Sequence, residues 1–286
     1  MVSFLYFALV IGFSMVLNHP LSQAISLLSV MLYVIPIEPK QSMQFLLRFC
    51  LPMLFMTALI NPAFNHEGRT ILLYLHNGNP LTLESICYGI SAGCMLTSIL
   101  LWFSAFSRVM SSDKFIYLFG KILPALSLVL SMSLRFVPKF KTQMKAVAEA
   151  QRCIGRDVST GSLLTRTKTA IVIFSIMITW ALENAIETAD SMKSRGYGLK
   201  GRTAFTIYRW EERDYYMMIW LGFCGLFILT GHICQAFGFR FYPDIRCAAL
   251  DGITIWFYLI YLALSMTPSV LNWREERKWK ILYSKM

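Results

Sequence analysis

The chain has 286 residues, of which 56% are hydrophobic and only 15% charged, so one water-soluble domain of this size cannot bury its apolar surface. Composition therefore predicts a membrane protein. The net charge of +11 is also seen in nucleic-acid-binding proteins, but the basic residues gather on one side of the expected topology, which argues against a nucleic-acid partner.

The chain is expected to begin with two membrane spans. Apolar runs cover Val2–Leu17 and Leu21–Ile37, with Asn18-His19-Pro20 between them. No small-residue cleavage site follows the first run, so we interpret it as a span and not as a cleaved signal peptide.

Two further spans complete an expected N-terminal membrane domain over residues 1–107. The third run covers Phe45–Ile60 and is expected to end at Asn61-Pro62, because proline removes a backbone donor and restrains the residue before it. The fourth covers Ile86–Phe106. Between them, the Asn-Gly-Asn-Pro turn at 77–80 predicts a surface hairpin within 63–85.

The character of the chain changes over residues 108–214, which carry 17 Lys and Arg against 9 Asp and Glu. We expect this segment to be a cytoplasmic domain of long helices. A C-terminal membrane domain over 215–268 follows, with spans at about 215–237 and 248–266, and then a basic tail over 269–286.

Basic residues decide the expected orientation. With six spans and a cytoplasmic N-terminus, 24 Lys and Arg lie inside and three, Arg69, Arg240 and Arg246, lie outside. Cytoplasmic loops are enriched in basic residues, so both termini are expected on the cytoplasmic side of the cell (inner) membrane.

Two apolar pieces of the middle segment leave an alternative open. Pro124–Val137 and Ala170–Leu182 each hold about 13 apolar-rich residues, fewer than the roughly 20 of a spanning helix. Crossing there would export seven basic residues between Lys139 and Lys168. We therefore favour helices that lie along the cytoplasmic face of the membrane, and keep a further pair of spans as the alternative.

Both helices of the middle segment are expected to end in the same way. The first closes on Arg152-Cys153-Ile154-Gly155-Arg156 and the second on Ser194-Arg195-Gly196. Glycine just past a helix adopts the left-handed conformation at little cost, and a basic residue in the last turn meets the negative end of the helix dipole. A good cap alone explains either ending, whereas two similar endings in one basic region indicate a docking function.

Small residues at helical spacing precede both endings. Alanines four apart allow two helices to approach closely, which predicts that the two helices form a crossed pair. Alanine is equally a common helix filler, so this interpretation and the plain one carry similar weight. The residues expected at the crossing are Ala146, Ala150, Ala181, Ala185 and Ala189.

Motifs for catalysis, metal and nucleotide binding are missing from the sequence. No Gly-x-x-x-x-Gly-Lys-Ser/Thr motif is present, so any ATP-driven work needs other chains. The seven cysteines form no C-x-x-C pair, and we expect no metal site and no bound cofactor. No constellation of catalytic side chains lies at membrane depth, so the chain is expected not to be an enzyme.

Five segments of the chain carry a resemblance to a known family. They are Asn18-His19-Pro20, TALINPAF at 57–64, MSLRFVPKF at 132–140, AQRCIGRD at 150–157 and ADSMKSRGYGLKGRT at 189–203. The sequence resembles the transmembrane T components of energy-coupling-factor (ECF) transporters, a family that includes cobalt-transport permeases. The resemblance extends over most of the chain and is most specific at the last segment, because the short helix-ending motifs of the family read Ala or Ser, Arg, Gly.

The resemblance implies an all-α membrane protein with about six transmembrane helices and long cytoplasmic coupling helices. Such a protein couples two cytoplasmic ATP-binding-cassette subunits, which hold ATP and Mg, to a membrane-embedded, substrate-binding S component, for uptake of a vitamin or a transition-metal ion. By motif match, Ser194, Arg195 and Gly196 would bind one ATPase, and Cys153, Ile154 and Gly155 the other.

One departure from the family pattern concerns the first motif, in which Ile154 stands where arginine is expected. Arg152 lies about 200° round the helix from it, and Arg156 lies beyond the glycine, so Arg156 is the preferred substitute. The difference between Ile154 and Arg195 indicates two different ATPases. A self-contained carrier or channel is the alternative, although the expected spans hold almost no ionisable residues.

Overall fold

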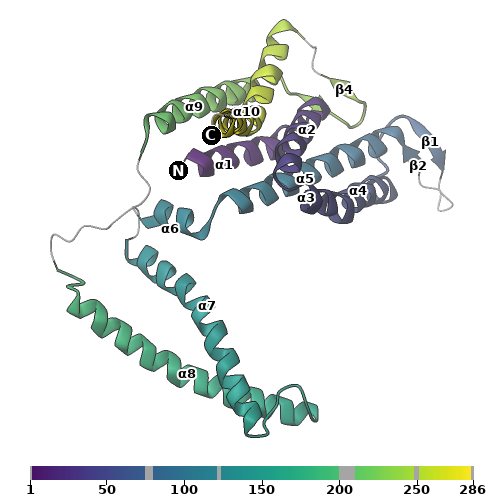
Figure 1. Ribbon diagram of the computed structural model, residues 1–286. Helices are drawn as coiled ribbons and strands as arrows, with labels where there is room; N and C mark the ends of the chain where they lie inside the picture. Colours follow the sequence, from purple (N-terminus) through teal and green to yellow (C-terminus); the bar gives the residue numbers. More distant parts are fainter. Residues whose placement is uncertain (1, 75–79, 121–123, 200–209, 248–250, 285–286) are drawn as a thin grey trace. The chain divides into compact units, whose positions relative to one another are not determined.

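The computed structural model describes residues 2–74, 80–120, 124–199, 210–247 and 251–284. The described chain is mainly α-helical, which confirms an all-α membrane fold (Figure 1). It divides into two compact units, the first formed by Met1–Ser111 with Trp210–Met286 and the second by Ser112–Arg209.

Eight helical segments and two small hairpins make up the described part of the first unit. Figure 1 labels all of them except the π-helical turn η1 and strand β3. The segments are α1 (Val2–Val16), α2 (Pro20–Ile37), α3 (Pro39–Phe45), η1 (Leu46–Cys50), α4 (Leu51–Phe64), α5 (Leu83–Val109), α9 (Glu212–Ile233) and α10 (Gly252–Tyr283).

Six helical stretches of the described chain are long and apolar enough to cross a membrane, which matches the expected number. The set differs from the expected one, however. Helix α8 (Leu163–Ser194) belongs to it, with an 18-residue window of mean hydropathy 1.7, so the expectation that this segment is too short to span is wrong. The apolar run continues past Leu182 through Ala185 and Ile186, because Glu183 is the one ionisable residue between Leu182 and Ile186. Helix α1, with 15 residues, is shorter than the other six.

The third expected span is also longer than the sequence indicates. Helix α3, η1 and α4 run without interruption from Pro39 to Phe64, and the helix continues through Pro62 instead of ending there. Pro62 has no N–H to bond the carbonyl of Ala58, and the helix ends two residues later, where the N–H of Asn65 donates to the carbonyl of Asn61.

Helices α4 and α5 pack unusually closely, because two glycines one turn apart face α4. A Cβ atom at Gly89 would lie 3.1 Å from the carbonyl oxygen of Thr57, and one at Gly93 would lie 3.2 Å from the Cα atom of Leu54. The spacing Gly89-x-x-x-Gly93 is the small-residue pattern that lets membrane helices approach each other.

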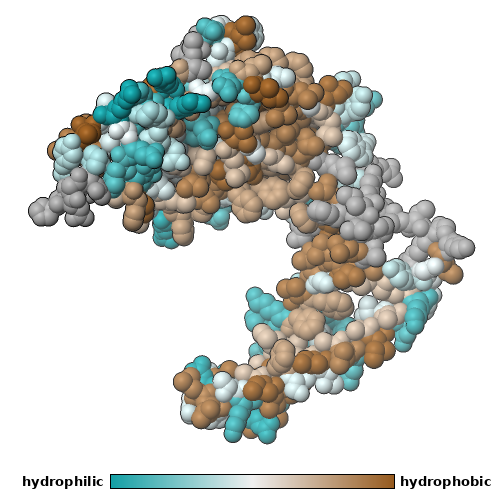
Figure 2. All heavy atoms as spheres, turned by 180° about the vertical axis from the view of Figure 1, so that it is seen from behind, coloured by the Kyte–Doolittle hydropathy of each residue, from teal (hydrophilic) through white to brown (hydrophobic). Residues whose placement is uncertain are grey.

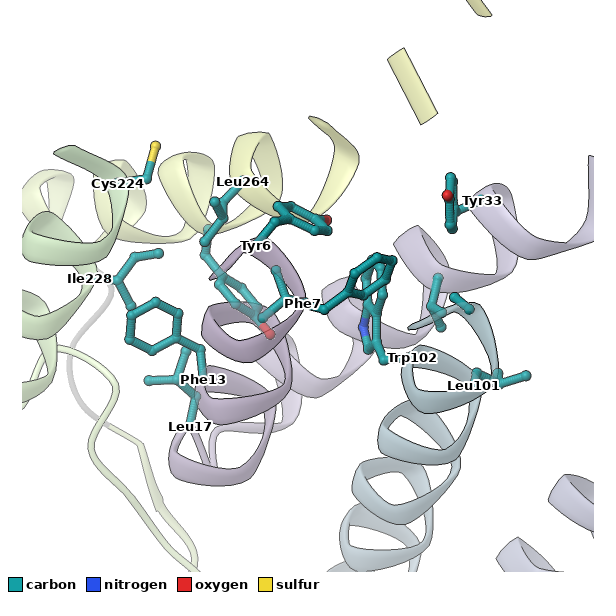
Figure 3. Close-up of a cluster of buried hydrophobic side chains, with 14 of the residues drawn as sticks. Tyr6, Phe7, Phe13, Leu17, Tyr33, Leu101, Trp102, Cys224, Ile228 and Leu264 are labelled. Atoms are coloured by element: carbon teal, nitrogen blue, oxygen red, sulfur yellow. The ribbon is translucent and has the colours of Figure 1, made fainter. Parts of the chain in front are cut away.

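The core of the first unit lies around α1 (Figure 3). Trp102 of α5 is fully buried and meets Phe7 of α1 edge to face, with ring centroids 6.2 Å apart. Further along α1, Phe13 points toward Ile228 of α9 (Figure 3). Helix α1 therefore joins the N-terminal helices to α9 and α10 although it is shorter than each of the six candidate spans.

Hydrogen bonds tie four helices together inside this core. The indole N–H of Trp102 donates to Ser26 Oγ at 3.0 Å, and the hydroxyls of Ser14 and Ser26 lie 2.8 Å apart. Tyr261 of α10 approaches Ser14 at 3.4 Å. Because unpaired polar groups are costly in an apolar interior, these bonds favour one register of α1, α2, α5 and α10.

Two antiparallel hairpins connect helices of the first unit. Strand β1 (Ile71–Tyr74) pairs with β2 (Pro80–Thr82), which confirms the hairpin expected there, while residues 77–79 of its predicted turn lie outside the described residues. Strand β3 (Phe239–Arg240) pairs with β4 (Arg246–Cys247) in a hairpin that the sequence analysis missed. Arg69 and Asp244 form an ion pair at 3.0 Å that joins the two hairpin regions.

The basic tail expected over 269–286 is not a separate segment in its described part. Helix α10 continues through Pro268 as far as Tyr283. Its last turns carry exposed charged residues. One of them is Arg277, whose guanidinium lies 3.5 Å from the ring centre of Trp273.

The second unit is built from α6 (Ser112–Gly120), α7 (Pro124–Cys153) and α8. Helix α8 has one buried stripe, Thr169, Ile173 and Met177, and an exposed apolar stripe that includes Ile171, Phe174 and Ile178. Hydrophobic side chains cover much of the visible surface of both units (Figure 2), as expected for a chain that meets lipid or membrane partners.

Candidate functional site

The end of α8 adopts the cap that its sequence predicts. Gly196 has a left-handed φ of +77°. Its N–H donates to the carbonyl of Lys193 at 2.9 Å, and the N–H of Tyr197 donates to the carbonyl of Met192 at 3.0 Å. This pair of bonds is the Schellman motif, which satisfies carbonyls that a helix end otherwise leaves unpaired.

The end of α7 repeats the same hydrogen bonds. Gly155 has a φ of +82°, its N–H donates to the carbonyl of Arg152 at 3.0 Å, and the N–H of Arg156 donates to the carbonyl of Gln151 at 3.0 Å. The cap glycines of the two helices are therefore equivalent positions.

Aligning the two caps pairs the residues of the two motifs one by one. Ile154 takes the position of Arg195, directly before the cap glycine, and Cys153 takes the position of Ser194. Ile154 and Arg195 are both exposed, while Ser194 donates its hydroxyl to the carbonyl of Ser191 at 2.9 Å. The two ends thus present the same backbone with different side chains at the tip.

Charged side chains at the end of α7 and in the loop that follows it interact with one another and with the loop backbone. Arg152 pairs with Asp157 at 3.3 Å, and Asp157 accepts the backbone N–H of Ser159 at 2.9 Å. The hydrogen bond from Ser159 holds the pKa of Asp157 below its ordinary value. Arg166 donates its Nε–H to the carbonyl of Val158 at 2.6 Å.

Arg156 is the arginine that the sequence analysis favours as a replacement for the missing anchor. Its backbone N–H closes the cap, its side chain is exposed, and among the described residues this side chain makes no hydrogen bond or ion pair. Arg152, the other candidate, turns back to Asp157. Both arginines are exposed, and they differ in that Arg152 is paired with Asp157.

Helices α7 and α8 cross, as expected, but larger side chains than alanine meet at the crossing (Figure 1). The rings of Phe140 and Trp180 lie edge to face with centroids 5.4 Å apart, and Lys139 donates to Asn184 Oδ1 at 3.2 Å. Ala181 is half-buried beside this contact.

The alanine crossing stays a prediction, and the contacts described between α7 and α8 are made by these aromatic and polar side chains. Four of the five alanines are exposed: Ala146, Ala150, Ala185 and Ala189.

A groove beside Arg195 was not foreseen from the sequence. It has a volume of about 700 Å³ and lies between the first half of α7 and the last turns of α8. Arg135, Lys139 and Arg195 line it together with apolar side chains such as Phe136 and Met192. A signal for it is the coincidence of basic and apolar residues at positions 132, 135, 136 and 139, which share one side of α7.

A third Schellman cap closes α9, and this one was also missed because it has no glycine. Gln235 has a φ of +55°, and the N–H of Ala236 donates to the carbonyl of Gly231 at 3.0 Å. Cys234 occupies the position of Ile154 and Arg195. Three described helices, α7, α8 and α9, therefore end in the same cap.

In the described part of the chain, no group of three or more His, Cys, Asp or Glu side chains comes together in a way that could hold a metal ion. His19 is buried, where its Nδ1 accepts the N–H of Leu21 and caps α2. His76 and the last residues of the motif at 189–203, from Lys200 onward, lie outside the described residues.

Several known proteins are similar in sequence to part of this chain. Its aligned segment is 37% identical over 90 residues to the energy-coupling factor transporter transmembrane protein EcfT of Lactobacillus helveticus, which is 31% of this chain and 32% of the relative. The corresponding protein of Lactococcus lactis is 35% identical over 95 residues, 33% of this chain and 36% of the relative. EcfT of Listeria innocua is 34% identical over 107 residues, 37% of this chain and 38% of the relative.

These alignments span about a third of the length of the curated relatives. The model of the cobalt transport protein family, CbiQ, matches a much longer segment, residues 2–205, which includes α1 to α8 and both helix ends. The chain is thus a multi-pass membrane protein of the cobalt transport protein family, the family of the transmembrane T components of energy-coupling-factor transporters.

Proposed function

We propose that this chain is the coupling subunit of an ATP-driven importer for a micronutrient, either a vitamin or a transition-metal ion. It docks two cytoplasmic ATP-binding-cassette subunits at the ends of α7 and α8, and it passes their motion to a membrane-embedded, substrate-binding S component. The chain itself is not catalytic and binds no cofactor, and ATP and Mg belong to the partner subunits.

One observation carries this proposal: two equal caps close two helices that cross each other. Gly155 and Gly196 expose the tip residues before them, and the crossing at Phe140 and Trp180 connects the helices between those ends. A displacement at either end is therefore transmitted to the other helix, because packed helices move as rigid elements.

Arg195 supplies the most specific contact of the proposed docking site. A guanidinium offers a planar fork of donors that suits carboxylates and backbone carbonyls of a partner. Arg195 also lines the groove between α7 and α8, so its docking is coupled to the spacing of these helices. Ser194 and Gly196 hold the backbone that presents it, and Cys153, Ile154, Gly155 and Arg156 form the second docking end.

The orientation that fits this function places the second unit and both ends of the chain on the cytoplasmic side of the cell membrane. Helix α8 is apolar enough to cross, but Arg166 and Lys168 lie near its start and Lys193 near its end. Crossing would export one of these basic groups. We therefore propose that α8 lies along the cytoplasmic face with its exposed apolar stripe toward lipid or the S component.

The decisive experiment reverses the charge at the proposed anchor. Arg195→Glu is expected to lower recovery of the ATPase subunits with the tagged chain, and uptake by cells, at least tenfold, because a like charge replaces the cation that faces partner carboxylates. Arg195→Ala tests the same contact without a new charge. Arg240→Glu, a change at an exposed arginine of the β3–β4 hairpin, is the matched control and is expected to leave both readouts unchanged.

If the complex and the uptake both persist in Arg195→Glu, the end of α8 is a cap and not a docking site. Transport by the purified chain alone in liposomes without ATP would instead support a self-contained carrier or channel. Recovery of ATPases without any S component would leave a membrane anchor that recruits them.

A further inference from the structure

We propose that the end of α10 binds anionic phospholipids through one face of the helix. We call this face the basic face of α10, and it consists of Arg274, Arg277, Lys278 and Lys280. Its ligand is the phosphate group of an anionic phospholipid such as phosphatidylglycerol, which lies in the cytoplasmic leaflet in the proposed orientation. Lipid binding here does not depend on ATPase docking, and the basic face lies outside residues 2–205, the segment that matches the family model.

The first reason is the depth of these residues in a membrane. Between Gly252 and Trp273, α10 carries no Asp, Glu, Lys, Arg or His residue. This stretch is about 33 Å long at a rise of about 1.5 Å a residue, close to the roughly 30 Å of the hydrocarbon core. The headgroup layer adds about 5–7 Å on each side, so the helical turn that begins at Arg274 lies at the level of the lipid phosphates.

The second reason is that charge is divided between two sides of this helix end. At about 100° a residue, the four basic side chains fall within about 160° of the helix circumference. Both carboxylates of this stretch, Glu275 and Glu276, fall outside that arc, although Glu276 borders it. Glu275 pairs with Arg213 of α9 at 3.5 Å, so the acidic first turn of α9 meets α10 on the side of Glu275. The basic face itself therefore contains no carboxylate.

The third reason is that these side chains are available to a ligand. Every described residue of α10 from Val270 onward is exposed, and among the described residues none makes a hydrogen bond or ion pair to a side chain of the basic face. The guanidinium of Arg277 lies over the ring of Trp273, which holds its position and leaves its N–H groups free for phosphate oxygens. A short helix exposed on all sides is marginally stable in water, so a surface that covers one side also stabilises it.

Position favours lipid over a soluble acidic partner. Three of the four basic residues, Arg274, Arg277 and Lys278, lie within about 8 Å of Trp273 along the helix axis, and long basic side chains reach the headgroups from there. Tryptophan itself prefers the boundary between hydrocarbon and headgroups. Each Lys or Arg next to a membrane surface strengthens attraction to anionic lipid by roughly fivefold in affinity.

Lipid retention by the purified, tagged, full-length chain tests the site. The chain is reconstituted into vesicles of equal parts phosphatidylglycerol and phosphatidylcholine and extracted in a mild detergent, and the retained lipids are counted by native mass spectrometry. The neutralised variant carries Arg274→Gln, Arg277→Gln, Lys278→Gln and Lys280→Gln.

Two further variants separate the face from the overall charge. The relocated variant keeps the net charge but moves two basic residues to the other side of the helix, through Arg274→Gln, Lys278→Gln, Asn272→Lys and Trp279→Lys. Because it keeps the number of basic residues that orient the chain in the membrane, it tests the site even if the neutralised variant inserts poorly. The acid-free variant carries Glu275→Gln and Glu276→Gln and is the matched control.

The wild-type chain is expected to retain phosphatidylglycerol at least tenfold over phosphatidylcholine, and this preference should shrink at about 1 M salt, where charges are screened beyond about 3 Å. The neutralised variant is expected to lose the preference at least tenfold and the relocated variant at least fivefold. The acid-free variant should keep it. Because all the changed residues are exposed, the melting temperatures in phosphatidylcholine are expected to equal that of the wild type.

A relocated variant that retains as much phosphatidylglycerol as the wild type would overturn the inference, because the attraction would then not come from this face. Displacement of the lipid by millimolar inorganic phosphate would overturn it too, in favour of a site for free phosphate. So would a neutralised variant that keeps the lipid but loses the ATPases in its native host, which would make the face a protein-docking surface. Since retention is measured on the chain alone, a failure of the proposed ATPase docking would leave this result unchanged.

Discussion

The rings of Phe140 and Trp180 meet edge to face, at 87° and with centroids 5.4 Å apart, where α7 crosses α8. Lys139 lies beside the same contact, with its ammonium 5.5 Å from the centre of the Trp180 ring and hydrogen-bonded to Asn184. This aromatic pair and this polar bond lie where two helices of 30 and 32 residues cross, and much of the remaining described surface of both helices is exposed.

Replacing Trp180 with alanine is expected to weaken this crossing. The aromatic pair contributes about 0.5–1.5 kcal/mol beyond the area it buries, so the melting temperature of the detergent-purified chain should fall. Phe140→Ala in the Trp180→Ala background should add less than it does alone, because the pair is already broken. Trp279→Ala, at an exposed position of α10, is the control, and an equal loss there would show that the crossing is not special.

Gly93 is expected to tolerate no larger side chain. A Cβ atom there would lie 2.5 Å from Thr57 Oγ1 and 3.2 Å from the backbone of α4, so Gly93→Ala must push α4 and α5 apart at a cost of about 1–3 kcal/mol. Gly12→Ala on α1 meets no atom within 4 Å and is the matched control. Thermal unfolding in detergent measures both, and equal stability of the two variants would contradict the close packing.

The positive φ of Gly196 predicts a further loss when the residue is changed. Gly196→Ala forces an L side chain into the left-handed region and brings its Cβ within 3.0 Å of Leu199, so a destabilisation of about 1 kcal/mol is expected. Gln235→Gly, at the equivalent position of α9, is expected to stabilise the chain by a similar amount. Opposite shifts in melting temperature check this pair, and shifts of the same sign would refute the shared cap.

Thiol labelling is expected to place both ends of α8 on one side of the membrane. Single cysteines are introduced at Ser162 and Ser194 after the exposed Cys153, Cys234 and Cys247 are changed to serine. An impermeant reagent added to intact cells should label neither of them, and should label both after permeabilisation, whereas a control chain that keeps Cys247 and carries neither new cysteine should react from outside. Labelling of only one of the two from outside would show that α8 crosses the membrane.

The loop after α7 is expected to lose order in acid. Folding lowers the pKa of Asp157, mainly through the hydrogen bond from Ser159, so this carboxylate stabilises the loop above its ordinary pKa of 3.8. The stabilisation is lost as pH falls through the lowered value in the folded state. The difference between wild type and Asp157→Asn, measured as mobility of a spin label at position 160, should be present at pH 7 and vanish in that acid range. A difference that persists would contradict the assignment.

Much of the fold follows from local sequence patterns. The spans at α2, α5 and α9, the β1–β2 hairpin and the glycine caps at 155 and 196 are confirmed, because each depends on residues close together in the chain. The cap of α9 was missed because glutamine takes the glycine position at Gln235. The length of the apolar part of α8 was underestimated, because apolar residues continue beyond Leu182 with polar residues between them.

Composition and local patterns are enough to predict an apolar, mainly helical membrane protein, with two similar helix ends in its basic segment and different residues, Ile154 and Arg195, before their glycines. Which side chains meet where α7 crosses α8 follows only from the folded chain. Phe140 and Trp180 are 40 positions apart, and the alanines that matched the helical period equally well are mostly exposed. Periodicity identifies a face of a helix, but the partner of that face depends on packing between distant segments, which no local pattern contains.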